Sequence, residues 1–120
     1  MSGGGASRFP STMRLKRRKD FERVYRKGST WKGSCFSLHV LALDGEKKLG
    51  IVIPRKWGTA VERNRMKRVL REAFRTHADR LPDAAIIVRP GWTCRGETVK
   101  AFGRRLVDAV HETLGREVSR

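Results

Sequence analysis

The side chains with the clearest chemical potential in this sequence are the arginines of residues 59–77, which read TAVERNRMKRVLREAFRTH. A guanidinium group can donate paired hydrogen bonds to the oxygens of one phosphate, and it stays charged at any physiological pH. An asparagine among such groups adds an amide that both donates and accepts hydrogen bonds. The stretch therefore predicts a surface that binds regularly spaced phosphates. Its candidate residues are Arg63, Asn64, Arg65, Lys67, Arg68, Arg71 and Arg75.

A helix is predicted to position these residues. Thr59 and Glu62 have the spacing of a capping box, so the helix should begin there. Apolar residues then recur at steps of three and four, which is typical of one buried helical face. At about 100° per residue the basic residues occupy an adjoining sector of about 140°, and Arg65 alone lies on another side. The buried face consists of Met66, Val69, Leu70, Ala73 and Phe74.

The simplest alternative for these charges is a solvated helix face without a partner. Only Glu62 and Glu72 offer local negative charge. Each pair of like charges four residues apart destabilises a helix by about 0.2–0.5 kcal/mol. A helix that accumulates this repulsion is expected to meet an anionic partner that relieves it.

Protein-based catalysis finds little support in the sequence. Hydrolysis of a phosphodiester by protein groups needs clustered carboxylates that hold metal ions, or paired histidines that act as acid and base. The histidines, His39, His77 and His111, are scattered, and the acidic residues also occur singly. We therefore predict no catalytic residue and no metal ligand on this chain.

Length, charge and cysteine content restrict the class of protein. The chain has 120 residues, a charged fraction of 33% and a formal net charge of +16. It should form a single domain, and its charge predicts a polyanionic partner such as a nucleic acid. No signal peptide and no apolar run of about 20 residues is present, so a membrane partner is not expected. Cys35 and Cys94 lie far apart without a CxxC pair, which predicts free thiols in a reducing cytoplasm.

The remaining patterns predict the other elements. Residues 1–13 are rich in glycine and serine and predict a flexible tail. A short basic helix should follow, with Phe21, Val24 and Tyr25 on one face and a stop at Gly28. Strands are expected at 29–34, 35–43, 48–53 and 84–88, and Asp44-Gly45 predicts a hairpin between the second and third. A last helix at about 97–114 and a polar tail at 116–120 complete the chain. The order αβββαβα indicates an α+β sandwich with a single sheet.

The sequence carries a family resemblance in two places. The thirteen residues from Arg63 to Arg75 resemble the signature helix of the bacterial ribonuclease P protein subunit, and LKRRKDFERVYRKG resembles that family's first helix. The agreement covers nearly the whole of residues 14–115, which is the expected RNA-binding domain. The resemblance implies a ribosomal-protein-like fold with a left-handed βαβ crossover, although the general rule favours the opposite hand.

The resemblance also implies site residues. In the family, aromatic residues of the first helix border a groove that holds the single-stranded 5′ leader of precursor tRNA, and Phe21 and Tyr25 match these positions. Aromatic rings can stack on any base, which suits this task. His39 is a further candidate for this groove. Core packing of Phe21 and Tyr25, and a half-exposed strand position for His39, are the open alternatives. Lys56 matches a basic loop residue of the family; beside Arg55, it precedes a helix N-terminus that attracts phosphate. The simpler alternative is that Lys56 is an exposed loop lysine that only increases solubility.

The implied function is that of an RNA-binding subunit of an endoribonuclease. In the family the catalytic centre and its Mg²⁺ ions belong to the RNA subunit, and the protein binds ribonuclease P RNA and precursor tRNA without needing a protein partner. Three alternatives remain open. The chain could be a ribosomal or general structured-RNA-binding protein, a DNA-binding regulator, or a stand-alone nuclease. A DNA regulator is disfavoured because a strand and loop, rather than a helix and turn, precede the basic helix.

Overall fold

The predicted element order is confirmed by the computed structural model, which describes residues 9–118. Short 3-10 helices supplement the predicted elements at η1 (Ser11–Met13), η2 (Arg55–Trp57), η3 (Ala78–Arg80) and η4 (Trp92–Gly96). The main elements are α2 (Arg18–Lys27), β1 (Ser29–Lys32), β2 (Phe36–Ala42), β3 (Lys48–Ile51), α3 (Ala60–Thr76), β4 (Ala84–Pro90) and α4 (Val99–Val118).

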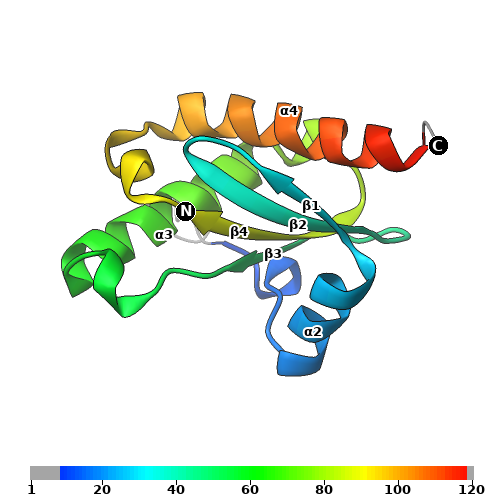
Figure 1. Cartoon of the computed structure of the whole chain (residues 1–120), viewed down its shortest axis with the longest axis horizontal. Coiled ribbons are helices and arrows are strands. Elements are labelled where there is room, and N and C mark those ends of the chain that lie inside the picture. Colours follow the sequence, from blue (N-terminus) through cyan, green and yellow to red (C-terminus); the bar gives the residue numbers. More distant parts are fainter. Residues whose placement is uncertain (1–8, 119–120) are drawn as a thin grey trace, which may run out of the picture.

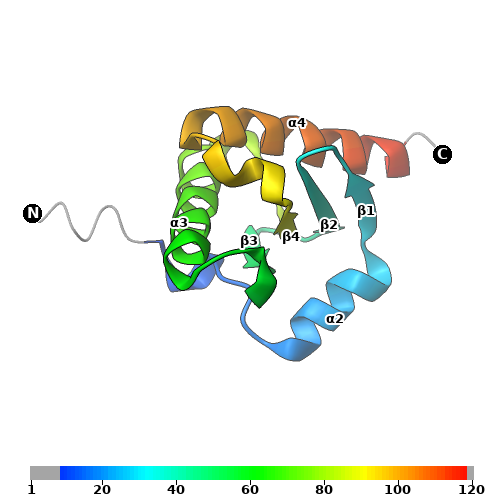
Figure 2. The same ribbon diagram turned by 60° about the vertical axis from the view of Figure 1, so that its left-hand side comes forward.

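One mixed sheet organises the molecule, with strand order β1-β2-β4-β3. β2 pairs antiparallel with both β1 and β4, whereas β3 pairs parallel with β4. Helices α3 and α4 lie on one side of the sheet and α2 lies on the other (Figures 1 and 2). The fold is therefore α+β with a single sheet. The chain crosses from β3 to β4 through α3, and the left hand of this crossover stays a prediction.

The predicted hairpin between the second and third strands is wrong. The turn itself forms, with Gly45 at φ +77°, but β4 is inserted between β2 and β3. The backbone N–H of Gly45 donates instead to the Asp83 side chain at 3.1 Å, just before β4 begins. A local Asp-Gly signal specifies a reversal of the chain, while strand pairing depends on a partner that is distant in sequence.

Alternation along β4 separates two apolar clusters. Ile86 and Val88 face α3 and α4 and pack in the larger cluster with Phe74 and Phe102. Ala85 and Ile87 face α2 and pack with Leu15 and Val24. Both faces of this strand are covered, which explains its continuous apolar run. The predicted inner face of α3 is confirmed, since Met66, Leu70, Ala73 and Phe74 are buried.

The capping box at the start of α3 forms as predicted. Glu62 N–H donates to Thr59 Oγ1 at 3.1 Å, and Thr59 N–H donates to Glu62 Oε1 at 2.9 Å. We expect Thr59→Ala to lower the free energy of unfolding by about 1 kcal/mol, because a helix N–H loses its acceptor. Urea unfolding followed by circular dichroism would measure this. Thr59→Ser should retain the wild-type midpoint, and an equal loss in both variants would contradict the capping role.

The two predicted tails need correction where the structure describes them. Residues 9–13, assigned to a flexible tail, include η1, and the Phe9 ring meets the Phe74 ring at 5.8 Å. Apolar Phe9 and Met13 pack on the core, a contact that composition alone does not reveal. Residues 1–8 lie outside the described residues. At the other end α4 continues to Val118, so 116–118 belong to the helix, and 119–120 are not described.

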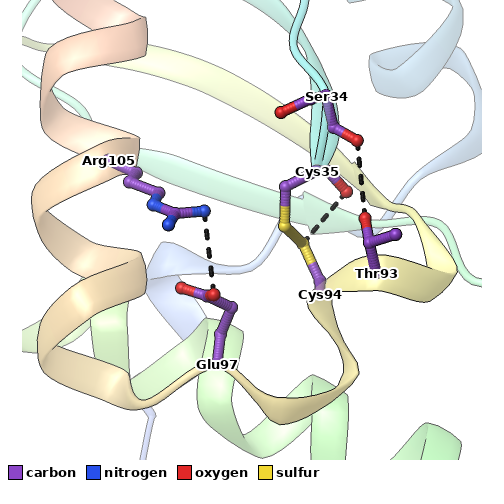
Figure 3. Close-up of a disulfide and its surroundings, with 6 residues drawn as sticks. All are labelled: Ser34, Cys35, Thr93, Cys94, Glu97 and Arg105. Carbon is purple, nitrogen blue, oxygen red and sulfur yellow. Dashed lines mark hydrogen bonds and ion pairs between the residues drawn. A yellow bond between two sulfur atoms is a disulfide. The ribbon is translucent and has the colours of Figure 1, made fainter.

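The prediction of free thiols is also wrong, because a disulfide joins Cys35 and Cys94 (Figure 3). Their Cα atoms are 5.4 Å apart although 59 positions separate them in sequence. The register of β2 with β4 places Phe36 opposite Pro90, and Gly91 N–H donates to the Cys35 carbonyl oxygen at 2.8 Å. Antiparallel pairing therefore brings η4 to the beginning of β2. The spacing of the cysteines could not indicate this contact.

Candidate nucleic-acid interface

The basic face of α3 is largely open to solvent. Asn64, Arg65 and Arg68 are exposed, and Lys67 and Arg71 are half-buried. Among the side chains of residues 9–115, which the structure describes, Arg65, Lys67, Arg68 and Arg71 form no ion pair with a carboxylate. Their positive charge is therefore not neutralised by the described part of the chain.

Two other arginines of α3 have internal partners. Arg75 donates to both oxygens of Glu72, at 2.7 and 3.2 Å. Arg63 Nη1 donates to the carbonyl oxygens of Gly58 and Arg55, at 2.7 and 3.0 Å. Arg63 therefore holds the η2 loop against the helix. Arg55 and Lys56 in that loop are exposed, so the predicted pair stands at the helix N-terminus.

Two adjoining hollows connect α3 to the N-terminal segment. One, of about 370 Å³, is lined by Asn64, Lys67, Arg68 and Arg71 together with Phe9, Arg14 and Glu72. The next, of about 330 Å³, shares four of these residues (Phe9, Arg14, Lys67 and Arg71) and extends to Phe21. Partial burial, with Arg14 nearby, lowers the pKa of Arg71 from its ordinary value. Concentrated positive charge of this kind is relieved when an anion binds.

Arg14 contributes to both hollows but was not among the predicted site residues. Its position follows from a pairing of the N-terminal segment with β3, in which Leu15 N–H donates to the Leu49 carbonyl oxygen at 2.9 Å. No local pattern in the sequence indicates this pairing, because it joins segments that are far apart in the chain.

The predicted aromatic residues lie on the α2 side of the sheet. Phe21 is half-buried and rests over Gly50, where an added Cβ would come within 2.8 Å of the ring. Tyr25 is 42% exposed, and its ring meets the His39 ring edge-to-face at 4.7 Å. Phe21 therefore serves partly as core, as the alternative interpretation held, while Tyr25 and His39 present ring surface to solvent.

Arg89 is a residue that the sequence analysis missed. It is exposed on β4, opposite Ser37 and on the same strand face as Ala85 and Ile87. The alternation of side chains along residues 84–90 (AAIIVRP) could have predicted that Arg89 lies on the sheet face covered by α2, which also carries His39. Burial, followed by the charges of Arg89 and Lys32, lowers the pKa of His39. His39 is thus a neutral ring within a cationic surface at pH 7.

We expect an NMR titration to place the pKa of His39 below the ordinary value of about 6.5. Arg89→Ala should move the pKa upward because it removes a repulsive charge. The unfolded chain takes up this proton more readily than the folded chain does. His39 should therefore reduce stability as the pH falls through 6.5 toward the lower folded pKa. A pKa at or above 6.5 would contradict this environment.

Two further features of the described residues bear on the chemistry. Among residues 9–115, whose side chains are described, no group of three or more His, Cys, Asp or Glu side chains lies close enough to hold a metal ion. In the same part of the chain, no helix is long and apolar enough to cross a membrane.

Comparison with known proteins gives a consistent result. The family model described as Ribonuclease P matches residues 9–113. The chain belongs to the ribonuclease P protein family. A relative from Chlamydia abortus, named ribonuclease P protein component, is 40% identical over 118 residues, covering 94% of this chain and 85% of the relative. A protein of the same name from Desulfotalea psychrophila is 39% identical over 89 residues, covering 71% and 74%.

Solved structures extend the similarity to three dimensions. The ribonuclease P protein from Thermotoga maritima superimposes with a TM-score of 0.73 at 27% identity, covering 82% of this chain and 96% of that one. The family resemblance drawn from residues 63–75, which begin with the Arg-Asn-Arg (RNR) run, is thereby confirmed.

Proposed function

We propose that this protein is the RNA-binding subunit of ribonuclease P and assists an RNA subunit in removing the 5′ leader from precursor tRNA. The observation that carries the proposal is the row of Lys67, Arg68 and Arg71 on α3, with Arg65 on a neighbouring side of the helix. These four cations lack carboxylate partners among the described side chains. A row of cations without carboxylate partners can contact the regularly spaced phosphates of folded RNA. Arg55, Lys56 and Asn64 extend this surface at the beginning of the helix.

The catalytic groups belong to the RNA subunit in this proposal. The Mg²⁺ ions of the holoenzyme are assigned to the RNA as well, as the family resemblance implies. The protein contributes positive charge, which offsets repulsion between RNA segments and reduces the Mg²⁺ that the RNA requires. The proposed compartment is the cytoplasm, and this rests on family membership alone, because the Cys35–Cys94 disulfide removes the argument from free thiols.

A processing assay tests the proposal directly. Precursor tRNA is incubated at low Mg²⁺ with a bacterial ribonuclease P RNA, with and without the protein. We expect correct 5′ cleavage to become efficient only when the protein is added. If the protein left the Mg²⁺ requirement unchanged, the proposal would be lost. Cleavage by protein freed of RNA would instead identify a nuclease, and stable comigration with ribosomal subunits would favour a ribosomal protein.

The second part of the proposal assigns leader binding to Phe21, Tyr25 and His39. Tyr25 is the best probe because its ring is exposed, whereas Phe21 also supports the packing of α2. We expect Tyr25→Ala to reduce the preference for leader-bearing over mature tRNA by about 5- to 100-fold, as the loss of one base-stacking ring does. Binding measurements with the holoenzyme on both tRNAs would show this.

Tyr25→Phe is the matched control because it keeps the ring and should keep most of the preference. If Tyr25→Ala weakened binding of mature and leader-bearing tRNA equally, the leader assignment would be wrong, although the RNA-binding function could stand.

A further inference from the structure

A second aromatic surface lies outside the residues considered so far. Trp92 in η4 is 46% exposed, and the Arg95 guanidinium lies over its ring, 3.9 Å from the centroid. The buried Trp57 ring meets Trp92 edge-on at 5.3 Å. These contacts hold Trp92 and Arg95 in a fixed relation, and we name the pair the Trp92–Arg95 platform.

The chain fixes the position of this platform from two sides. Cys94 lies between its two residues, and the disulfide to Cys35 attaches η4 to the beginning of β2 (Figure 3). From the other side, Trp57 belongs to the large core cluster and precedes α3 directly. An exposed tryptophan held in this way loses little conformational entropy when it binds a ligand, which favours affinity.

The local charge is positive. Arg95 is exposed, as are Arg55 and Lys56, which precede Trp57 in η2. No ion pair within 4.0 Å is recorded for Arg95 in the described part of the chain. The pKa of Glu62 is lowered chiefly by its hydrogen bonds with Thr59 and to a lesser extent by the charge of Arg95. Glu62 already serves the capping box.

An aromatic ring beside an unpaired guanidinium suits one class of ligand. An unpaired nucleotide can stack its base on the ring or on the guanidinium plane while its phosphate accepts hydrogen bonds from the arginine. A nucleotide carries both a flat aromatic base and a phosphate, so one residue of RNA can use the ring and the charge together. The combination therefore favours single-stranded nucleotides of an RNA.

The position of the platform indicates which RNA. η4 lies between α3 and the start of α4 (Figure 1), and Trp57 packs in the cluster on the α3 side of the sheet. Phe21 and Tyr25 lie with α2 on the opposite side. The platform is therefore continuous with the start of the α3 basic face and separate from the aromatic residues assigned to the leader.

We propose that Trp92 and Arg95 bind an unpaired nucleotide of the ribonuclease P RNA, beside the phosphates contacted by α3. The inference rests on the proposed function, since it takes that RNA as the partner. It adds a base-stacking contact to a surface otherwise described by charge. The ring supplies affinity that does not depend on salt, and Arg95 supplies one phosphate contact that does.

The test measures binding of the full chain to ribonuclease P RNA as a function of salt concentration. We expect Trp92→Ala to weaken binding by about 5- to 100-fold without changing the salt slope. Arg95→Ala should weaken binding and reduce the slope by about one. Trp92→Phe should retain most of the affinity. Binding of the RNA should also quench a tryptophan emission component that Trp92→Phe lacks.

Two control variants come from the same chain. Val61→Ala shortens a side chain on α3 that is 77% exposed, and Arg104→Ala removes one exposed charge from α4. Both should bind like wild type. Circular dichroism and urea unfolding confirm that each variant is folded.

Each possible outcome has a defined meaning. If Trp92→Ala bound within twofold of wild type, or no more weakly than Val61→Ala, the platform would be overturned. If Trp92→Ala left RNA-subunit affinity intact and lowered the preference for the leader, the assigned partner would be wrong. If wild-type protein did not bind ribonuclease P RNA, the proposed function itself would fail, which is a separate result.

Discussion

Replacing Arg65 and Arg68 together by alanine is expected to weaken binding of ribonuclease P RNA by roughly 25- to 100-fold near physiological salt. Both side chains are exposed on α3, and neither forms an ion pair with any side chain described between residues 9 and 115. Each lost phosphate contact removes the counterion release and the charge-assisted hydrogen bonds of one guanidinium, about 5- to 10-fold in affinity. The dependence of log affinity on log salt should become shallower by about two.

The same helix provides a matched control for this prediction. Arg75 carries the same charge, but its two hydrogen bonds to Glu72 already neutralise it. Arg75→Ala should therefore change RNA affinity by much less than Arg68→Ala does. Filter binding or fluorescence titration between about 50 mM and about 200 mM salt would compare the variants. Equal losses for Arg68→Ala and Arg75→Ala would show that net charge, rather than the exposed face of α3, determines affinity.

The second large effect concerns the disulfide. Reduction of Cys35–Cys94 is expected to lower the free energy of unfolding by about 2–4 kcal/mol, because a link across 59 positions restricts the unfolded chain. The measurement compares urea unfolding with and without a thiol reductant. After reduction, η4 should also separate more easily from the start of β2. The hydrogen bond that Thr93 Oγ1 donates to the Ser34 carbonyl oxygen is long, at 3.4 Å, and holds the two segments together only weakly.

A double variant, Cys35→Ala with Cys94→Ala, controls for the reductant itself. Its unfolding midpoint should lie below that of the oxidised protein and should not respond to reductant. If reductant left the wild-type midpoint unchanged, the disulfide would contribute nothing and the free thiols expected from sequence would describe the protein better. Reduction should also weaken RNA binding through η4 if the Trp92–Arg95 platform acts as proposed.

Local patterns in the sequence were sufficient to predict much of the functional surface. The step of three and four residues in 59–77 specified which face of α3 is buried, because the period of a helix is constant. The capping box was predicted from Thr59 and Glu62 alone, since both partners lie within one turn. The thirteen-residue RNR run was specific enough to indicate the family, which the family model confirmed.

Contacts between distant segments were decided only by the tertiary structure. The insertion of β4 between β2 and β3, the Cys35–Cys94 disulfide and the pairing of residues 14–15 with β3 all join positions far apart in sequence. Such contacts depend on the packing of whole elements, so no local period or spacing encodes them. For the same reason, which arginines of α3 remain free, and the meeting of Trp92 with Arg95 and Trp57, became visible only in the folded chain.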